Sequence, residues 1–83
     1  MKFTAEIDIM PHKELLDPQG KAVQHSMGNL HIAGVHDVRI GKHIRMEVEA
    51  ASKDEATAKV DEACKKLLAN LIMETYHFTL HEN

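Results

Sequence analysis

The sequence is poor in the features that mark several large classes of protein. Its 83 residues include one cysteine, Cys64, so an internal disulfide is impossible. No apolar run approaches the roughly 18 residues of a membrane-spanning segment, and the first residues lack the apolar stretch of a signal peptide. These absences predict a protein of the reducing cytoplasm that has no membrane partner.

Positive charge is also scarce, and the formal net charge is −3. A general nucleic-acid binder needs a basic surface to replace the counterions of the phosphates. An RNA-recognition domain also needs aromatic side chains on the outer face of its central strands. The outer positions of the strands predicted below are instead Thr4, Glu6, Asp8, Arg45, Glu47 and Glu49. No nucleic-acid partner is therefore expected.

The length predicts a single domain over residues 1–83. A chain of this size buries only about 60–65% of its unfolded surface on folding, which leaves a thin core. Partner subunits commonly supply the missing burial, so a homodimer or a higher oligomer is expected.

Alternating polarity predicts four strands, each with one apolar face. The apolar positions are Phe3, Ala5, Ile7 and Ile9 before Pro11, then Val38 and Ile40, then Ile44, Met46, Val48 and Ala50, and finally Ile72, Tyr76, Phe78 and Leu80. The second and third strands form a predicted hairpin. A two-residue loop would set apolar against polar side chains on one face, so we expect a three-residue loop at 41–43 or a bulge.

Two helices are predicted between these strands. Asp17 is a favoured N-cap and Pro18 a favoured first residue, so a helix begins there with an apolar stripe. The stripe is Val23, Met27 and Leu30. Ser52 and Glu55 form a capping box for the second helix. Its stripe is Ala56, Val60, Ala63, Cys64, Leu67 and Leu68, and Asn70 is expected in the left-handed region after it.

The element order is βαββαβ. Because each strand is apolar on one side only, both helices should cover one face of a four-stranded antiparallel sheet. The expected class is therefore α+β, with the ferredoxin-like arrangement.

This fold hosts many functions, so each function has to be tested on residues. A metal chaperone of this fold needs a Cys-x-x-Cys loop, and an acylphosphatase-like enzyme needs an arginine beside a phosphate-binding loop; residues 12–19 offer neither. His77 and His81 would lie about 13 Å apart along a strand, too far to bind one metal ion. Cys64 falls on an apolar stripe, where a thiol is usually inert. No catalytic residue and no metal site are expected.

Two segments remain without a clear structural role. Arg39 and Arg45 would face each other across the predicted hairpin, with Lys42 at its turn. They are either neutralised by neighbouring carboxylates or form a docking surface for an acidic partner or an anion. Gln19 and Gly20 are poor choices for a helix start if capping were the only demand, which favours a partner interface there.

Four segments of the sequence form a recognisable set. They are Leu16-Asp17-Pro18-Gln19-Gly20-Lys21-Ala22-Val23, Asp37-Val38-Arg39-Ile40-Gly41-Lys42, Cys64-Lys65-Lys66-Leu67-Leu68-Ala69-Asn70 and Glu74-Thr75-Tyr76. In their order and spacing they resemble the PurS family, and the resemblance covers nearly the whole chain. The chain departs from the usual pattern at residues 26–32, where Gly28 and His31 are unusual.

The resemblance implies a non-catalytic subunit of phosphoribosylformylglycinamidine synthase in purine biosynthesis. Such a subunit forms a homodimer, bridges the glutaminase subunit PurQ and the synthetase subunit PurL, and aids the transfer of ammonia. ATP and magnesium would belong to the synthetase. The implied interface residues are Asp17, Pro18, Gln19, Gly20, Arg39, Gly41, Lys42 and Arg45, and Asn70 would form a tight turn between helix and strand.

A second hypothesis is an ACT-like regulatory module that binds a small molecule on the same topology. Such a module usually has a glycine just after its first strand. Pro11 and His12 occupy that position here, which weakens the hypothesis.

Overall fold

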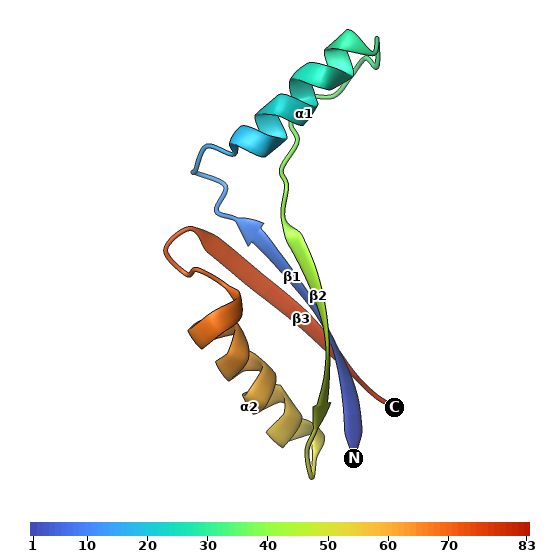
Figure 1. The fold of residues 1–83 in the computed structure, drawn as a ribbon, viewed down its shortest axis with the longest axis vertical. Helices are drawn as coiled ribbons and strands as arrows, with labels where there is room; N and C mark the ends of the chain where they lie inside the picture. The colour runs from blue at the N-terminus through green and yellow to red at the C-terminus, as the bar shows by residue number, and fades with distance from the viewer.

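The computed structural model describes residues 1–83 as five main elements (Figure 1). They are β1 (Lys2–Pro11), α1 (Pro18–Asn29), β2 (Lys42–Glu49), α2 (Lys53–Ala63) and β3 (Glu74–Glu82). A short π-helical segment, η1 (Cys64–Leu68), continues α2. None of the helices has the length and apolar character needed to cross a membrane.

The strands form one antiparallel sheet in the order β2-β1-β3, with β1 in the centre. Ile7 of β1 lies opposite Ile44 of β2 and Phe78 of β3, so the apolar positions of all three strands share one face. The predicted alternation in β1 is confirmed, because Phe3, Ala5, Ile7 and Ile9 are all buried.

Helix α2 covers the apolar face of the sheet (Figure 1). The buried residues are Ala56 and Val60 of α2 and Cys64 of η1. They pack on the apolar side chains of β1. The predicted N-cap is confirmed, because Ser52 Oγ accepts a hydrogen bond from the Glu55 amide at 3.2 Å. Glu55 reaches back to the amide of Ala51 rather than to that of Ser52.

The predicted fourth strand and its hairpin are wrong. Residues 38–41 form no strand, and the chain runs from them directly into β2. The Ile40 amide, which a strand would use for pairing, instead donates to the Asp17 carboxylate at 2.6 Å. Arg39 and Arg45 consequently do not face each other.

The predicted place of α1 is also wrong. It begins at Pro18 as expected, but it projects beyond the sheet instead of covering it (Figure 1). Its expected apolar stripe remains largely open, with Val23 and Met27 half-buried and Leu30 67% exposed. Because no strand packs on it, the molecule measures 51 × 27 × 14 Å.

Three smaller expectations fail at the end of α2. Leu67 is 80% exposed and Ile72 is 87% exposed, although both were expected to face inward. The widened turn of η1 shifts the helical register, so a stripe spaced for an α-helix no longer faces the sheet there. Asn70 does not adopt the left-handed conformation, which is found only at His31 among non-glycine residues.

Candidate partner-binding site at the base of the projecting helix

Residues 21–37, which comprise α1 from Lys21 onward and the chain that returns from it, are called the arm below. Asp17, a residue that is only 7% exposed, holds the arm at its base with its carboxylate. Its Oδ1 accepts from the Gly20 amide at 3.0 Å and its Oδ2 from the Ile40 amide at 2.6 Å. These two amides, with the charge of Arg39, hold the pKa of Asp17 below its usual range. An ionised Asp17 therefore ties the start of the arm to its end.

Gly20 is required by the same junction. A side chain there would place its Cβ 1.9 Å from the carbonyl oxygen of Val38. The first turn of α1 thus packs directly on the returning chain, which a residue with a Cβ could not do. This contact explains the glycine that helix capping alone left unexplained.

Arg39 fastens the base from the other side. Its Nη2 donates to the carbonyl of His12 at 2.6 Å, and His12 Nε2 donates to the carbonyl of Leu71 at 3.1 Å. Arg39 also borders a surface hollow of about 490 Å³ together with Lys13 and Glu14. The half-buried guanidinium therefore links the loop after β1 to the start of β2.

The other predicted basic residues lie apart from Arg39. Lys42 begins β2 opposite Ile9, while the Nε of Arg45 donates to Glu6 Oε1 at 2.7 Å on the outer face of the sheet. Gly41 lies against β1, because a Cβ there would meet the carbonyl oxygen of Ile9 at 2.3 Å. The three cations do not form the single basic tip that the hairpin would have produced.

Asn70 forms the expected tight turn between η1 and β3. Its Oδ1 accepts from the Ile72 amide at 3.1 Å, and its carbonyl accepts from the amides of Met73 and Glu74 at 2.9 and 2.7 Å. Its own amide donates to the Glu74 carboxylate at 2.8 Å. The turn exposes apolar side chains at its tip.

One hollow brings several of the predicted interface residues together. It measures about 310 Å³ and lies between the loop before α1 and the turn before β3. Asp17, Pro18 and Asn70 line it, with the apolar residues Leu15, Leu16, Ile40 and Met73. Leu16 is 73% exposed and Ile72 lies on the adjoining turn. We call this hollow and its exposed rim the apolar notch.

Sequence reasoning missed the apolar members of this notch. The signal was present, because Leu15 and Leu16 immediately precede the N-cap and Leu71, Ile72 and Met73 form a short apolar run. The alternation pattern places Ile72 on an apolar strand face and assigns Leu15 and Leu16 to no element. Only the fold shows that they meet on one exposed surface.

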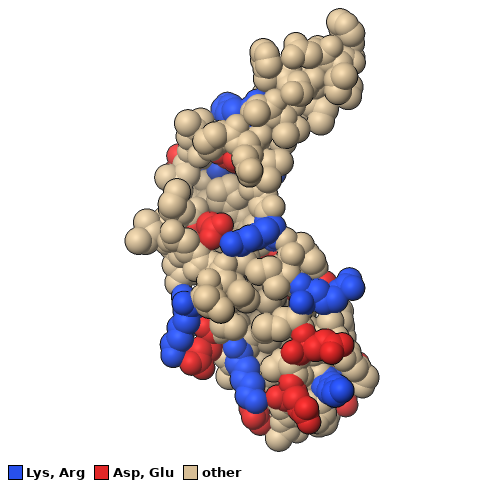
Figure 2. Space-filling model, viewed as in Figure 1, with Lys and Arg blue, Asp and Glu red and all other residues tan.

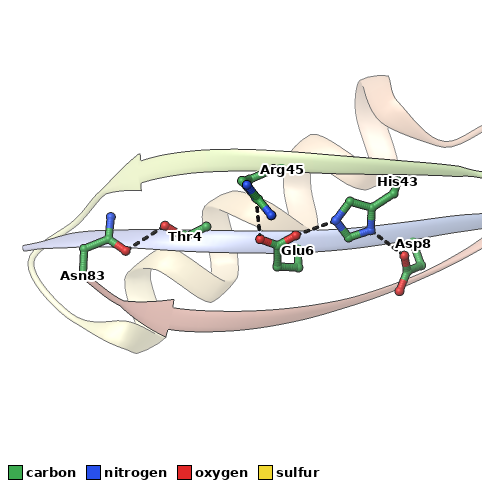
Figure 3. A network of polar contacts seen from close by, with 6 residues as sticks. All are labelled: Thr4, Glu6, Asp8, His43, Arg45 and Asn83. Atoms are coloured by element: carbon green, nitrogen blue, oxygen red, sulfur yellow. Dashed lines mark hydrogen bonds and ion pairs between the residues drawn. The ribbon is translucent and has the colours of Figure 1, made fainter.

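A second polar cluster lies on the outer face of the sheet (Figure 3). His43 Nδ1 bonds to Asp8 Oδ1 at 2.7 Å and its Nε2 bonds to Glu6 Oε2 at 2.5 Å. Two carboxylates can both accept from one ring only if both nitrogens carry protons, so these bonds raise the pKa of His43. Bonds from His43 and Arg45 correspondingly lower the pKa of Glu6. The two cations and two carboxylates of the cluster thus compensate each other's charge.

Charge is distributed unevenly over the molecule. Lys and Arg side chains alternate with Asp and Glu over the body, whereas none appears on the projecting end of the arm in the face shown (Figure 2). The sequence contains no Asp, Glu, Lys or Arg in residues 22–36. No group of three or more His, Cys, Asp or Glu side chains is arranged to hold a metal ion.

The chain is similar to proteins of known assembly. The family model for PurS, described as phosphoribosylformylglycinamidine (FGAM) synthase, matches residues 4–82. Phosphoribosylformylglycinamidine synthase subunit PurS of Bacillus subtilis is 36% identical over 80 residues, which cover 96% of this chain and 94% of that protein. The subunit of the same name from Synechocystis is 42% identical over 78 residues, which cover 94% of this chain and 78% of that protein.

The fold is similar to solved structures of the same family. A B. subtilis PurS structure superposes with a TM-score of 0.87 at 36% identity, covering 96% of this chain and 99% of that one. A chain in the structure of PurLQS from Thermotoga maritima superposes with a TM-score of 0.90 at 31% identity, covering 98% of this chain and 99% of that one.

Proposed function

Because the chain belongs to the PurS family, and is thus a subunit of phosphoribosylformylglycinamidine synthase, we propose that it joins the glutaminase and synthetase subunits of that ligase. The observation that carries the proposal is the likeness to a chain of the PurLQS assembly from T. maritima, which extends over 98% of this chain. The family match over residues 4–82 replaces the alternative of a small-molecule-binding regulatory module.

In this role the chain supplies contacts rather than chemistry. The family match over residues 4–82 supports a single connecting domain over residues 1–83 that has no catalytic site of its own. Glutamine hydrolysis, ATP and Mg²⁺ then belong to the larger subunits, and the chain aids the passage of ammonia by holding them in register. The assembly works in the cytoplasm.

The apolar notch is the contact that best fits a larger subunit. It combines a concave apolar surface with exposed side chains of Leu16, Ile72 and Met73, which is the character of an interface core. Pro18 and Gln19 are exposed beside it, whereas Asp17 and Gly20 are buried and shape it from within. Arg39, Gly41 and Asn70 hold its walls in place, and Lys42 and Arg45 supply exposed charge at the adjoining strand.

The connecting role is tested by reconstitution. The synthetase and glutaminase subunits are assayed with and without this chain, using glutamine or free ammonia as the nitrogen source. Amidine formation from glutamine should require the chain, while formation from ammonia should not, because free ammonia bypasses the transfer between subunits. Equal glutamine-dependent rates with and without the chain would refute the role.

The notch is tested with one charged substitution at two exposed leucines. Leu16→Asp should reduce co-purification with the larger subunits at least about tenfold, because a carboxylate cannot be buried unpaired in an apolar contact. Leu67→Asp is the matched control, since Leu67 is equally exposed but lies outside the hollow. If both variants lost co-purification equally, or if neither lost it, the notch would not be part of the interface.

A further inference from the structure

Arg39 carries a charge that the chain compensates only in part. Its guanidinium is half-buried and makes one hydrogen bond, from Nη2 to the carbonyl oxygen of His12 at 2.6 Å. No carboxylate forms an ion pair with it. Asp17 is near enough for the charge of Arg39 to lower its pKa, but both Asp17 oxygens already accept from main-chain amides. A guanidinium has five N–H donors, so most of the donors of Arg39 have no partner within the chain.

A hollow of about 490 Å³ lies beside this guanidinium. Three segments that are distant in the sequence line it, namely residues 10–14 at the end of β1, Arg39 before β2 and Thr75 at the start of β3. Its volume lies within the range of about 300–1,000 Å³ that is usual for small-molecule sites. The hollow is therefore large enough to hold a small organic molecule.

The charged side chains around the hollow favour an anion. Arg39 and Lys13 are its two cations, and Lys13 forms no ion pair within the chain. Glu14 is the only carboxylate that lines the hollow, and its side chain is exposed and unpaired. Two cations and one carboxylate leave an excess of positive charge, in a chain whose net charge is −3.

The strongest of these groups is already oriented for binding. Its bond to the His12 carbonyl holds Arg39, and the His12 ring is itself held by the carbonyl of Leu71 at 3.1 Å. A guanidinium in a fixed orientation offers parallel N–H groups that match two oxygens of a carboxylate or a phosphate. Because the side chain is ordered before binding, little conformational entropy remains to be lost.

The neighbours of Arg39 favour a phosphate over a carboxylate. A phosphate monoester carries close to two negative charges at neutral pH, so Arg39 and Lys13 can each compensate one of them. A carboxylate has a single charge, which Arg39 alone compensates. Met10 and Pro11 add apolar surface to the same hollow, which suits the organic part of an ester.

We propose that this hollow binds a small organic phosphate monoester. Arg39 binds two phosphate oxygens, Lys13 compensates the second negative charge, and the organic group lies against Met10 and Pro11. Glu14 repels the phosphate and limits its affinity. The hollow shares only Pro11 with the apolar notch, so the ligand and a larger subunit contact different surfaces. The site is an addition to the connecting role and does not depend on it.

Binding is tested by NMR titration of the isotope-labelled chain with inorganic phosphate and with phenyl phosphate. The titration is made at constant ionic strength and about pH 8, where a phosphate monoester is a dianion. Amide signals of residues 12–14, Arg39 and Thr75 should shift together and saturate. Phenyl phosphate should bind at least about threefold more tightly than inorganic phosphate, because its ring contacts the apolar wall. Shifts that spread over all lysines without saturation would overturn the proposal, as would equal affinity for the two ligands.

Two substitutions with opposite expected effects separate a site from a general effect of charge. Lys13→Gln should weaken binding of inorganic phosphate about threefold, whereas Glu14→Gln should strengthen it about twofold. Lys53→Gln is the matched control, since Lys53 is also exposed and unpaired but lies at the start of α2, outside the hollow. It should leave the affinity unchanged. Equal weakening in Lys13→Gln and Lys53→Gln would reduce the effect to long-range attraction and overturn the site.

Arg39→Lys tests the guanidinium itself. The variant keeps the positive charge but loses the two parallel N–H groups, so it should weaken binding of inorganic phosphate at least about tenfold. Arg39 also bonds to His12, and the thermal midpoint of the variant is therefore measured beside its affinity. If the variant does not fold, Lys13→Gln and Glu14→Gln decide the question. A folded Arg39→Lys chain that binds phosphate as the wild type does would overturn the proposal.

These outcomes are separable from the connecting role. If phosphate causes no localised shifts while Lys13→Gln abolishes co-purification with the larger subunits, the hollow receives a carboxylate of a subunit, and the small-molecule ligand is overturned. If phosphate binds as described but glutamine-dependent amidine formation does not require the chain, the connecting role fails and the phosphate site stands.

Discussion

At the scale of single residues, Asp17 joins two segments that are far apart in the sequence. One carboxylate oxygen caps α1 and the other accepts a hydrogen bond from the Ile40 amide. The side chain therefore connects the two ends of the arm. A capping role could be predicted from Asp17 and Pro18 alone. The second bond could not, because it depends on where residues 38–41 run after they fail to pair as a strand.

Asp17→Asn should lower the thermal unfolding midpoint, because one of the two amides would then face an NH₂ group instead of an acceptor. The pKa of Asp17 is lowered in the folded state, so its contribution to stability is present at neutral pH and is lost as the pH falls through the lowered value. The difference between the thermal midpoints of the wild type and the variant should therefore shrink once the pH falls below about 4, the pKa of an unfolded aspartate, and vanish below the lowered pKa of the folded state. Asp37→Asn, at an exposed position without a recorded bond, is the control and should not change the midpoint.

His43 should show the opposite pH dependence. Its bonds to Asp8 and Glu6 raise its pKa, so the stability that it contributes is fully present below the pKa of an unfolded histidine and is lost as the pH rises through the raised value. A histidine NMR titration should place the midpoint of His43 above about 6.5, the value for a free histidine side chain. A midpoint below that value would show that the carboxylate clamp does not form in solution.

This cluster of Glu6, Asp8, His43 and Arg45 was not predicted, although its members Glu6, Asp8 and Arg45 were assigned correctly to the outer face. Asp8 lies opposite His43 and Glu6 opposite Arg45 only because β1 pairs with β2. In the predicted hairpin, the strand at residues 38–40 would instead pair with the strand at residues 44–50. Facing direction follows from the alternation within one strand, whereas contacts across strands require the strand order.

At the scale of elements, the prediction was correct for the elements whose apolar side chains are buried in the common core. β1, β2, α2 and β3 were located by alternation, by a capping box and by an apolar stripe, and each lies against the common core. The pattern of Val38 and Ile40 was misleading, because Val38 contacts Gly20 and the Ile40 amide is bound by a side chain. α1 was correctly predicted to be a helix, but its apolar stripe does not indicate that these side chains are left uncovered by the rest of the chain.

The junction between α1 and the returning chain can be tested by a matched pair in one turn of helix. Gly20→Ala should destabilise the fold by about 1–3 kcal/mol, because its Cβ would overlap the Val38 carbonyl oxygen and separate the two segments. Gln19→Ala lies on the exposed side of the same turn and should change the unfolding free energy by less than about 0.5 kcal/mol. Denaturant titrations measure both values.

If Gly20→Ala were as stable as Gln19→Ala, the close approach in the arm base would not exist in solution. If Gln19→Ala folded normally but failed to bind the larger subunits, Gln19 would be confirmed as an interface residue. The pair thus separates the structural from the interaction role of the Asp-Pro-Gln-Gly segment.

At the scale of the whole molecule, the core is small for the length of the chain, with 11 of 83 residues buried. The thin core was predicted from size, and an oligomer was predicted from the thin core. The exposure of α1 was not predicted, because an exposed apolar residue on a projecting helix and a buried one have the same sequence pattern.

Stability should therefore depend on protein concentration. An oligomer, which the thin core predicts, gains stability by mass action, so the thermal midpoint at neutral pH should rise over an about hundredfold increase in concentration. Differential scanning calorimetry measures the midpoint, and a wild-type midpoint independent of concentration would contradict a stabilising oligomer.

The central place of β1 has a consequence for synthesis. β1 is made first, yet one of its two neighbours, β3, is made last, and Thr4 bonds to Asn83 across 79 positions of sequence. While β3 is still inside the ribosome, the emerged chain can pair only β1 with β2, which leaves one side of β1 open to other unfinished chains. The sheet can therefore close only after β3 has emerged, and until then one edge of β1 stays unpaired.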